Sequence, residues 1–488
     1  MADSYNPATD INSPAFECAA YLDQIADVTL VNDCYQGTSA VAAKAQTYLR
    51  KYGAEDPGDY QARLSSSKFW NAFRRTVHGL IGLIFRKNPV LQEDVPEEIK
   101  AHLEDVDMQG THIDVFAKER GLRGLIDGHS FVYVDKPEAV KESVTTLSPS
   151  PTLNDDRAGR QRPYWVAVDK DQVVNWRVEK VGGVDTLTQV TIWECLLEYE
   201  GRFGETLVDQ YLVLEPGHWT RYRQDDKKWA VYSEGDTNLD YIPLVPFYSL
   251  QTGFFQSTPP LLDVAHENLR HYNLQSSLDR ILDLCNVPTP VLKGRPGPPY
   301  ENLIVGNGVI DIPENGDAKF LEPTGTAISA TQNEIDRCKA NIASLGLLLL
   351  SSQPKVTKTA TETTVEYTAE TAELSAIARN LQDCIERCLM IHADYMGIES
   401  GGSIKVNKDF VRLGIDPISW QRLQDDVANN RLTLETYWKI LENSEVLPED
   451  FKAKNEKTAI DKQKAQIDPA NLGLQANTEG GVFQAPPS

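Results

Sequence analysis

Residues 259–288 read PPLLDVAHENLRHYNLQSSLDRILDLCNVP. Apolar side chains recur at every third or fourth position from Leu261 to Cys285, which is the spacing of one face of an α-helix. Thr258 can cap the first turn, prolines are tolerated at the first helical positions, and Val287-Pro288 ends the pattern. We therefore predict a helix of about 27 residues and about 40 Å, long for a core helix and typical of a spoke or stem.

Two more long helices are predicted downstream, with β structure and a polar loop between them. Residues 288–326 contain a Gly/Pro-rich run and the dipeptide Asn307-Gly308 between Ile-Val and Val-Ile, which is a strong hairpin signal. A second helix is expected from about Ile328 to Leu349, followed by a polar loop over 350–361. The third helix is expected from about Thr361 to Met396.

The chain before residue 259 predicts an α+β domain. One amphipathic helix is expected over Asp59–Phe85 and a second over Ile113–Ile126, followed by a strand over Ser130–Asp135. Residues 137–163 are rich in Ser, Thr, Pro and Asp without a period, which indicates a surface loop. Short β-branched and aromatic runs over 164–250 then predict an antiparallel sheet.

The C-terminal region predicts a smaller helical part. Helices are expected over Trp420–Asn429 and Leu434–Asn443, followed by a polar tail that ends in Ala-Pro-Pro-Ser. The last stretch, about 30 residues, is expected to be poorly ordered unless a partner holds it.

Composition limits the classes of function. The 488 residues could bury two to four domain-sized cores. The net charge of -23 disfavours tight DNA binding, which normally uses a basic patch to displace phosphate counterions. An acidic wall would still let a polyanion slide past without adhering, although solubility alone also explains the charge.

The cysteines and the apolar stretches indicate a reducing compartment and no membrane insertion. The seven cysteines are scattered, without the paired spacing of a zinc site or the density of a secreted scaffold. The N-terminus lacks the basic and apolar blocks of a signal peptide. Val77–Phe85 and Leu345–Leu350 are the most apolar stretches, and both are far shorter than the roughly 20 residues that span a bilayer.

Several phrases resemble one subgroup of the portal proteins, or head-to-tail connectors, of tailed bacteriophages, a subgroup catalogued as a domain of unknown function. The resemblance extends from about residue 50 to 460, whereas the first 50 residues and the loop 137–163 match no pattern of the subgroup. The matching phrases are Tyr60–Leu64, Phe69–Phe73, Gly79–Pro89, Arg162–Tyr164, Val174–Arg177, Ile242–Pro246, Pro259–Ala265, Asn268 with His271-Tyr272, Val287–Val291, Glu322–Gly325 and Lys358–Ala360.

The resemblance implies a portal fold: an α/β wing, long stem helices, a small α/β clip, a tunnel loop and a helical crown. It divides the chain into an N-terminal region with the wing (1–258), a stem helix (259–286), the clip (287–327), a second stem helix (328–349), the tunnel loop (350–361), a long wing helix (362–397), and the crown with a flexible tail (398–488).

The implied function is structural. Copies of the chain would close head to tail into a ring, usually a dodecamer, at one capsid vertex, and double-stranded viral DNA would pass through it non-specifically during packaging and ejection. The implied partners are the terminase large subunit, head-tail adaptor and tail proteins, the major capsid protein and a scaffold protein. The implied location is the virion, with the host cytoplasm during assembly and no membrane.

The tunnel-loop candidates are Gln353, Lys355, Thr357 and Lys358. A few flexible cations there could touch the phosphate backbone of passing DNA without reading its sequence. The simpler interpretation is a pair of solvated loop lysines.

Glu362, Glu366, Glu370 and Glu373 follow at helical spacing near the start of the third helix. They could line the channel as a carboxylate ring that keeps DNA from adhering, or they could simply complement the helix dipole in solvent.

The clip candidates for partner docking are Lys293, Arg295, Glu301 and Asn302, on a Gly/Pro-framed tip. In portal proteins the clip faces outward and receives the packaging ATPase and later the head-completion proteins. A plain hairpin loop is the alternative.

Catalytic signals are weak, and we predict no enzyme activity, no metal and no cofactor. The sequence has no GxxxxGK[ST] phosphate loop, so ATP hydrolysis is expected of a partner. Core packing explains Cys384, Cys388 and His392 better than a zinc site does, because structural zinc takes four ligands. The proximity of His129, Ser130 and Asp135 in sequence does not make a hydrolase triad, because adjacent strand residues point to opposite faces.

Two other classes stay open. The chain could be an intracellular enzyme that uses a Glu or His base in the α+β domain. It could also be another virion protein, such as a capsid or head-completion subunit, although the long interrupted helix pair argues against a capsid fold.

Overall fold

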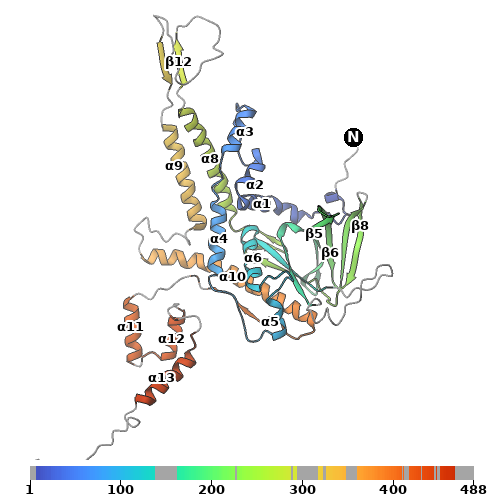
Figure 1. Ribbon diagram of the computed structural model, residues 1–488, viewed down its shortest axis with the longest axis vertical. Coiled ribbons are helices and arrows are strands. Elements are labelled where there is room, and N and C mark those ends of the chain that lie inside the picture. The colour runs from blue at the N-terminus through green and yellow to red at the C-terminus, as the bar shows by residue number, and fades with distance from the viewer. Residues whose placement is uncertain are drawn as a thin grey trace, which may run out of the picture. The chain divides into compact units, whose positions relative to one another are not determined.

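The computed structural model describes residues 7–137, 162–225, 228–286, 289–293, 317–321, 326–347, 360–408, 410, 417–429, 431–443, 447 and 451–467 (Figure 1). The chain divides into two compact units, residues 1–408 and residues 409–488. The α+β class predicted from the sequence is confirmed, because helices and antiparallel sheets occur together in the first unit.

Two antiparallel sheets form the centre of the first unit, and the antiparallel structure predicted over 164–250 is confirmed. Among the described residues one sheet has three strands in the order β3 (Tyr164–Val168), β2 (His129–Asp135) and β9 (Leu244–Tyr248). The other has five consecutive strands: β4 (Val173–Val181), β5 (Val184–Glu200), β6 (Gly204–Glu215), β7 (His218–Asp225) and β8 (Lys228–Asp236).

The main apolar core lies between these sheets. It is built mostly from alternating strand residues, since side chains of a strand alternate between its faces, and Ile242 and Phe255 join it from the connecting segments. Its buried members are Phe131, Tyr133, Val168, Val173, Val190, Ile192, Leu212, Leu214, Trp219, Ile242, Leu244 and Phe255.

Helix α6 (Ile113–Asp127) confirms the helix predicted over Ile113–Ile126, and it packs on the opposite face of the three-stranded sheet. A Cβ at Gly124 would lie 2.1 Å from the Phe247 ring, so this contact requires glycine. Gly128 ends the helix with a φ of +90°, and β2 begins at the next residue.

The N-terminal helices are α1 (Ala19–Gln36), α2 (Thr38–Ala43), α3 (Pro57–Ser66) and α4 (Ala72–Ile84). The single helix predicted over Asp59–Phe85 is wrong, because Ser67 is extended and separates α3 from α4. The break is stable because the Asn71 side chain accepts a hydrogen bond from Arg74 N–H, while Asn268 accepts from the first two N–H groups of α4.

Helix α8 (Leu262–Asn286) begins three residues after the predicted start, because Pro259 and Pro260 lie in the turn before it. Strands β12 (Thr289–Lys293) and β13 (Asp317–Leu321) pair antiparallel, and α9 (Thr326–Ile342) follows them. A π-helical turn (Ala343–Leu347) extends α9, and α10 (Ala360–Met396) agrees with the predicted third helix.

Short elements complete the first unit. They are the 3-10 turns η1 (Pro7–Thr9), η2 (Ala45–Thr47) and η3 (Lys170–Gln172), helix α5 (Glu97–Leu103), and two small antiparallel pairs, β1 (Val90–Leu91) with β14 (Ile404–Lys405) and β10 (Gln251–Gly253) with β11 (Gln256–Ser257).

The second unit contains the two predicted helices, α11 (Pro417–Ala428) and α12 (Leu434–Asn443), and a third, α13 (Ala453–Ile467). The sequence pattern predicted only a polar tail here, because residues 453–467 lack an apolar stripe; in the structure residues 453–459 are exposed. An ion pair of 2.7 Å from Lys457 Nζ to Glu435 joins α13 to α12. None of the described helices has the length and apolar content that crossing a bilayer requires.

Candidate functional site

Helices α8 and α9 lie side by side and antiparallel, joined to the strand pair β12–β13 at one end (Figure 1). We call α8, β12, β13 and α9 the arm. Among the described side chains of α9, only a narrow stripe is buried: Ile335, Cys338 and Ile342. The others are exposed or half-buried. An amphipathic helix normally buries a wider face, so the described part of the chain gives α9 little cover.

The clip candidates lie at and beyond the end of the strand pair. In the register Lys293 stands opposite Asp317, at the last described position of the ladder. Arg295, Glu301 and Asn302 lie outside the described residues, and so does the predicted turn at Asn307-Gly308. Their docking role stays a prediction.

The channel candidates lie around the start of α10. Gln353, Lys355, Thr357 and Lys358 lie outside the described residues. Glu362, Glu366 and Glu370 belong to the first turns of α10, but their side chains lie outside the described part of the structure, and their channel role stays a prediction. The next acid of the series, Glu373, is exposed.

A buried ion pair fastens the N-terminal region to α8, and sequence reasoning missed it. Arg63 on α3 donates from Nε and Nη2 to the two carboxylate oxygens of Glu55, at 2.8 Å each. Arg63 Nη1 also donates to Ser276 Oγ on α8 at 3.2 Å, and Arg280 of α8 contacts the same carboxylate. The hydrogen bonds from Arg63 hold the pKa of Glu55 down at about 2.

The stripe predicted on α10 is core. Cys384, Cys388 and His392 are buried, as packing predicted, and His392 Nε2 is 3.0 Å from Nδ1 of His102 on α5. Burial lowers the pKa of His392 to about 3, so this ring is neutral. Within the described part of the chain no three His, Cys, Asp or Glu side chains converge as metal ligands would.

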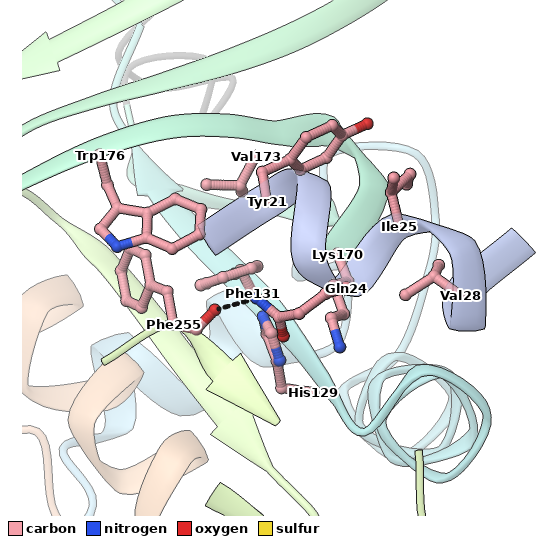
Figure 2. A pocket seen from close by; sticks show the side chains of 10 residues that line it. All are labelled: Tyr21, Gln24, Ile25, Val28, His129, Phe131, Lys170, Val173, Trp176 and Phe255. Carbon is pink, nitrogen blue, oxygen red and sulfur yellow. Dashed lines mark hydrogen bonds between the residues drawn. The ribbon is translucent and has the colours of Figure 1, made fainter. Parts of the chain in front are cut away.

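A second buried polar group lies beside the main core, where α1, β2 and η3 meet (Figure 2). Lys170 Nζ donates to Asp127 O at 2.9 Å, to Ser257 O at 3.0 Å and to Ser257 Oγ at 3.2 Å. His129 Nδ1 and the same Ser257 Oγ are hydrogen-bonded at 2.6 Å. We call Asp127, His129, Lys170 and Ser257 the polar centre.

Burial sets the ionisation of the polar centre. It raises the pKa of Asp127 to about 7, lowers the pKa of Lys170 to about 8, and lowers the pKa of His129. Shifted pKa values of this kind occur both in active sites and in buried structural networks. Whether a substrate could fit beside the polar centre therefore distinguishes a catalytic role from a structural one.

The cavity beside the polar centre has a volume of about 10 Å³, which is room for about one water molecule and not for an organic substrate. Helix α1 closes its wall, where Gln24 donates to Phe255 O (Figure 2). The same side chain accepts from Ser257 N–H. All three donors of Lys170 are used. The group therefore fastens β11, and with it the chain entering α8, to the sheet.

The predicted separation of His129, Ser130 and Asp135 is confirmed. Ser130 Oγ donates to Arg120 O at 3.0 Å, whereas His129 is bonded to Ser257. Asp135 accepts hydrogen bonds from two tyrosine hydroxyls, at 3.1 and 2.8 Å. These three residues therefore do not form a hydrolase triad.

Residues 260–396 match the family model described as "Domain of unknown function (DUF4055)", a stretch that contains the arm and α10. No curated protein matches the chain.

Three solved structures resemble the chain at 11% identity. One is from the virion of a native gene transfer agent particle, with a TM-score of 0.36, and the match covers 81% of this chain and 94% of that one. The second is from the neck of an empty particle computed with C6 symmetry, with a TM-score of 0.36 and coverage of 80% and 93%. The third is from the neck of a native particle computed with C12 symmetry, with a TM-score of 0.38 and coverage of 82% and 97%. TM-scores of this size establish no common fold.

Proposed function

We propose that the chain is a portal-type subunit, one copy of a closed ring at a capsid vertex through which double-stranded DNA passes. The observation that carries the proposal is the arm: two long antiparallel helices joined at a β-strand pair, with most of the α9 surface uncovered. This is the order of stem, clip and stem that the sequence resemblance implies.

The energetics of the arm support assembly. Helix α9 buries three described side chains on a narrow stripe, although most helical stability in proteins comes from packing of a whole amphipathic face. Its exposed positions are polar or small, with no apolar patch to drive aggregation. Such a surface fits a wet contact with a neighbouring copy, where each arm supports the next around the ring.

In this proposal the α+β part up to residue 258 is the wing, residues 287–327 are the clip, and residues 350–361 are the tunnel loop. Lys355 and Lys358 would contact phosphates transiently, and Glu362, Glu366 and Glu370 would repel DNA from the wall. The clip would dock the terminase large subunit during packaging and head-completion proteins afterwards, and the wing would meet the capsid.

The chain acts in this proposal as a conduit and not as an enzyme. One candidate for an active site is the polar centre, and its cavity holds about one water molecule. Its lysine, serine and histidine are bonded to one another and to backbone groups, which fits a structural fastening.

Electron microscopy of the purified chain tests the proposal, together with mass from light scattering. Twelve copies of a 54.5 kDa chain have a mass of about 650 kDa, and top views should show rings with a central hole. A particle that stays monomeric across salt, concentration and added scaffold protein would contradict the proposal.

A further inference from the structure

One helix face carries positive charge in a chain of net charge -23. Between Asp59 and Glu93 the sequence has six Lys and Arg residues and no acid. Within this run α4 turns its apolar side to the core and exposes Arg74, Arg75 and His78. Together with Lys68, which precedes the helix and is exposed, these residues form what we call the basic face.

Two members of the basic face are free to bind. Arg74 already donates to the carbonyl oxygens of Tyr35 and Gln36 at the end of α1. The side chains of Lys68 and Arg75 make no hydrogen bond or ion pair within the described part of the chain. A desolvating partner would therefore gain two cations without breaking internal contacts.

The complementary feature is a ribbon that projects from the five-stranded sheet. β4 pairs with β5 only up to Ile192, and β7 pairs with β6 only from Gln210 onward. Residues 195–209 therefore pair only with each other, as a two-stranded hairpin, which we call the acidic ribbon. It carries Glu198, Glu200, Glu205 and Asp209 against one arginine, Arg202.

The acidic ribbon also exposes apolar side chains. Leu197 stands opposite Leu207 and Tyr199 opposite Glu205, so these four lie on one face. The exposed fractions are 46% for Leu197, 68% for Leu207, 81% for Tyr199 and 88% for Phe203 in the turn. Two-stranded hairpins are marginally stable in water, and exposed apolar clusters mark interaction sites. The ribbon needs a partner surface.

The two surfaces belong to opposite outer layers of the first unit. Helix α4 packs on α6, α6 packs on the three-stranded sheet, and the five-stranded sheet covers the other face of that sheet. The basic face and the acidic ribbon therefore cannot meet within one copy. Two different surfaces on opposite sides of a subunit are what a head-to-tail contact uses, and such contacts close into rings.

We propose that the acidic ribbon of one copy docks on the basic face of α4 in the next copy. This inference rests on the proposed ring. Carboxylates of Glu205 and Asp209, which lie on the same face as Tyr199, would pair with Lys68 and Arg75, and the Arg75 guanidinium would stack on Tyr199. A nucleic acid fits the basic face by charge, but it leaves the ribbon uncovered and would be repelled by it.

Charge reversal with mixing tests the pairing. Variant A carries Lys68→Glu with Arg75→Glu, and variant B carries Glu205→Lys with Asp209→Lys. At fixed protein concentration, the yield of rings from either variant alone should fall about tenfold or more, because like charges would meet at every contact. Mixed in equal amounts, A and B should form rings again, since each contact then joins opposite charges.

The matched control for variant A is Lys118→Glu with Lys439→Glu, which reverses two exposed lysines elsewhere and should leave rings intact. Circular dichroism melting checks that A and B fold as the unaltered chain does. Filter binding of A to a DNA duplex tests the competing occupant.

Rings of unchanged yield in both variants would overturn the pairing and leave the proposed function standing. Loss of rings in A and B without recovery on mixing would also overturn it. Loss of DNA binding by A with rings intact would assign the basic face to nucleic acid instead. An unaltered chain that never forms rings would overturn the pairing together with the proposed function.

Discussion

Removing the carboxylate of Glu55 should destabilise the first unit far more than its surface ion pairs suggest. The side chains of Arg63 and Glu55 are 6% and 0% exposed, so the pair is shielded from water. Glu55→Ala would leave the guanidinium of Arg63 buried without its counter-charge. Breaking a buried pair on one side costs about 3–5 kcal/mol.

The structure indicates why the cost lies in that range. The Glu55 carboxylate accepts two bonds from Arg63, one from Arg280 and one from Tyr52 N–H. Hydrogen bonds to charged groups contribute about 1.5–3 kcal/mol each, but bonds that share one carboxylate are not additive. Replacing both partners should therefore cost much less than the sum of the single replacements.

A double-mutant cycle of Glu55→Ala and Arg63→Ala measures this coupling by urea denaturation, with amide exchange of α3 as a local readout. We expect a coupling energy of about 2 kcal/mol or more. The control is Arg270 with Glu334 on the arm, a pair at 2.9 Å whose side chains are each 39% exposed. Exposed pairs contribute at most about 1 kcal/mol.

The pH dependence gives a second readout. The folded pKa of Glu55 is lowered to about 2 from its usual 4.5, so its stabilisation is complete above pH 4.5 and is lost as the pH falls toward 2. The stability difference between the unaltered chain and Glu55→Ala should shrink over that window. A coupling energy between Glu55 and Arg63 no larger than that between Glu334 and Arg270 would refute the reasoning from burial.

Three further outcomes are expected. Asp127→Asn should stabilise the chain by about 3 kcal/mol more at pH 8 than at pH 5 in melting experiments. The reason is that the folded pKa of Asp127 is near 7, so the ionised carboxyl destabilises the folded chain increasingly as the pH rises from 4 through 7. An equal effect at both pH values would contradict this. Gly124→Ala should cost about 1–3 kcal/mol in denaturation, since its Cβ would enter the buried Phe247 ring. Lys355→Glu with Lys358→Glu should leave rings intact and reduce DNA packaging or retention. Full genomes at normal particle yield would contradict a role of these lysines in contacting DNA.

Periodicity predicted much of the fold, for a physical reason. A helix or strand that buries one face repeats its apolar residues with the period of the element, so α6, β2 and α10 could be placed to within a few residues. The antiparallel strand pairing followed from the alternation and turns of 164–250. The break between α3 and α4 was missed, because Asn268, about 200 residues away in sequence, stabilises it.

The buried polar groups could not be predicted from one sequence. Glu55 and Arg63 look like ordinary surface charges, and only the fold brings Ser276 and Arg280 to them. The polar centre joins residues more than a hundred positions apart, as in the bond between His129 and Ser257. Hydrogen bonds carry no periodic signal, so side chains of this kind become visible only when the backbone is known.

These polar groups bond only one of the two arm helices, α8, to the N-terminal region among the described residues. The side of α8 that faces the N-terminal region is bonded to it along its length: Asn268 caps α4, and Asn273 bonds Arg50 N–H and Tyr48 O at 3.0 and 2.7 Å. Helix α9 packs on α8 through its narrow apolar stripe. Helix α8 is therefore the fixed element of the arm, and in the proposed ring the exposed side of α9 would be covered by a neighbouring copy.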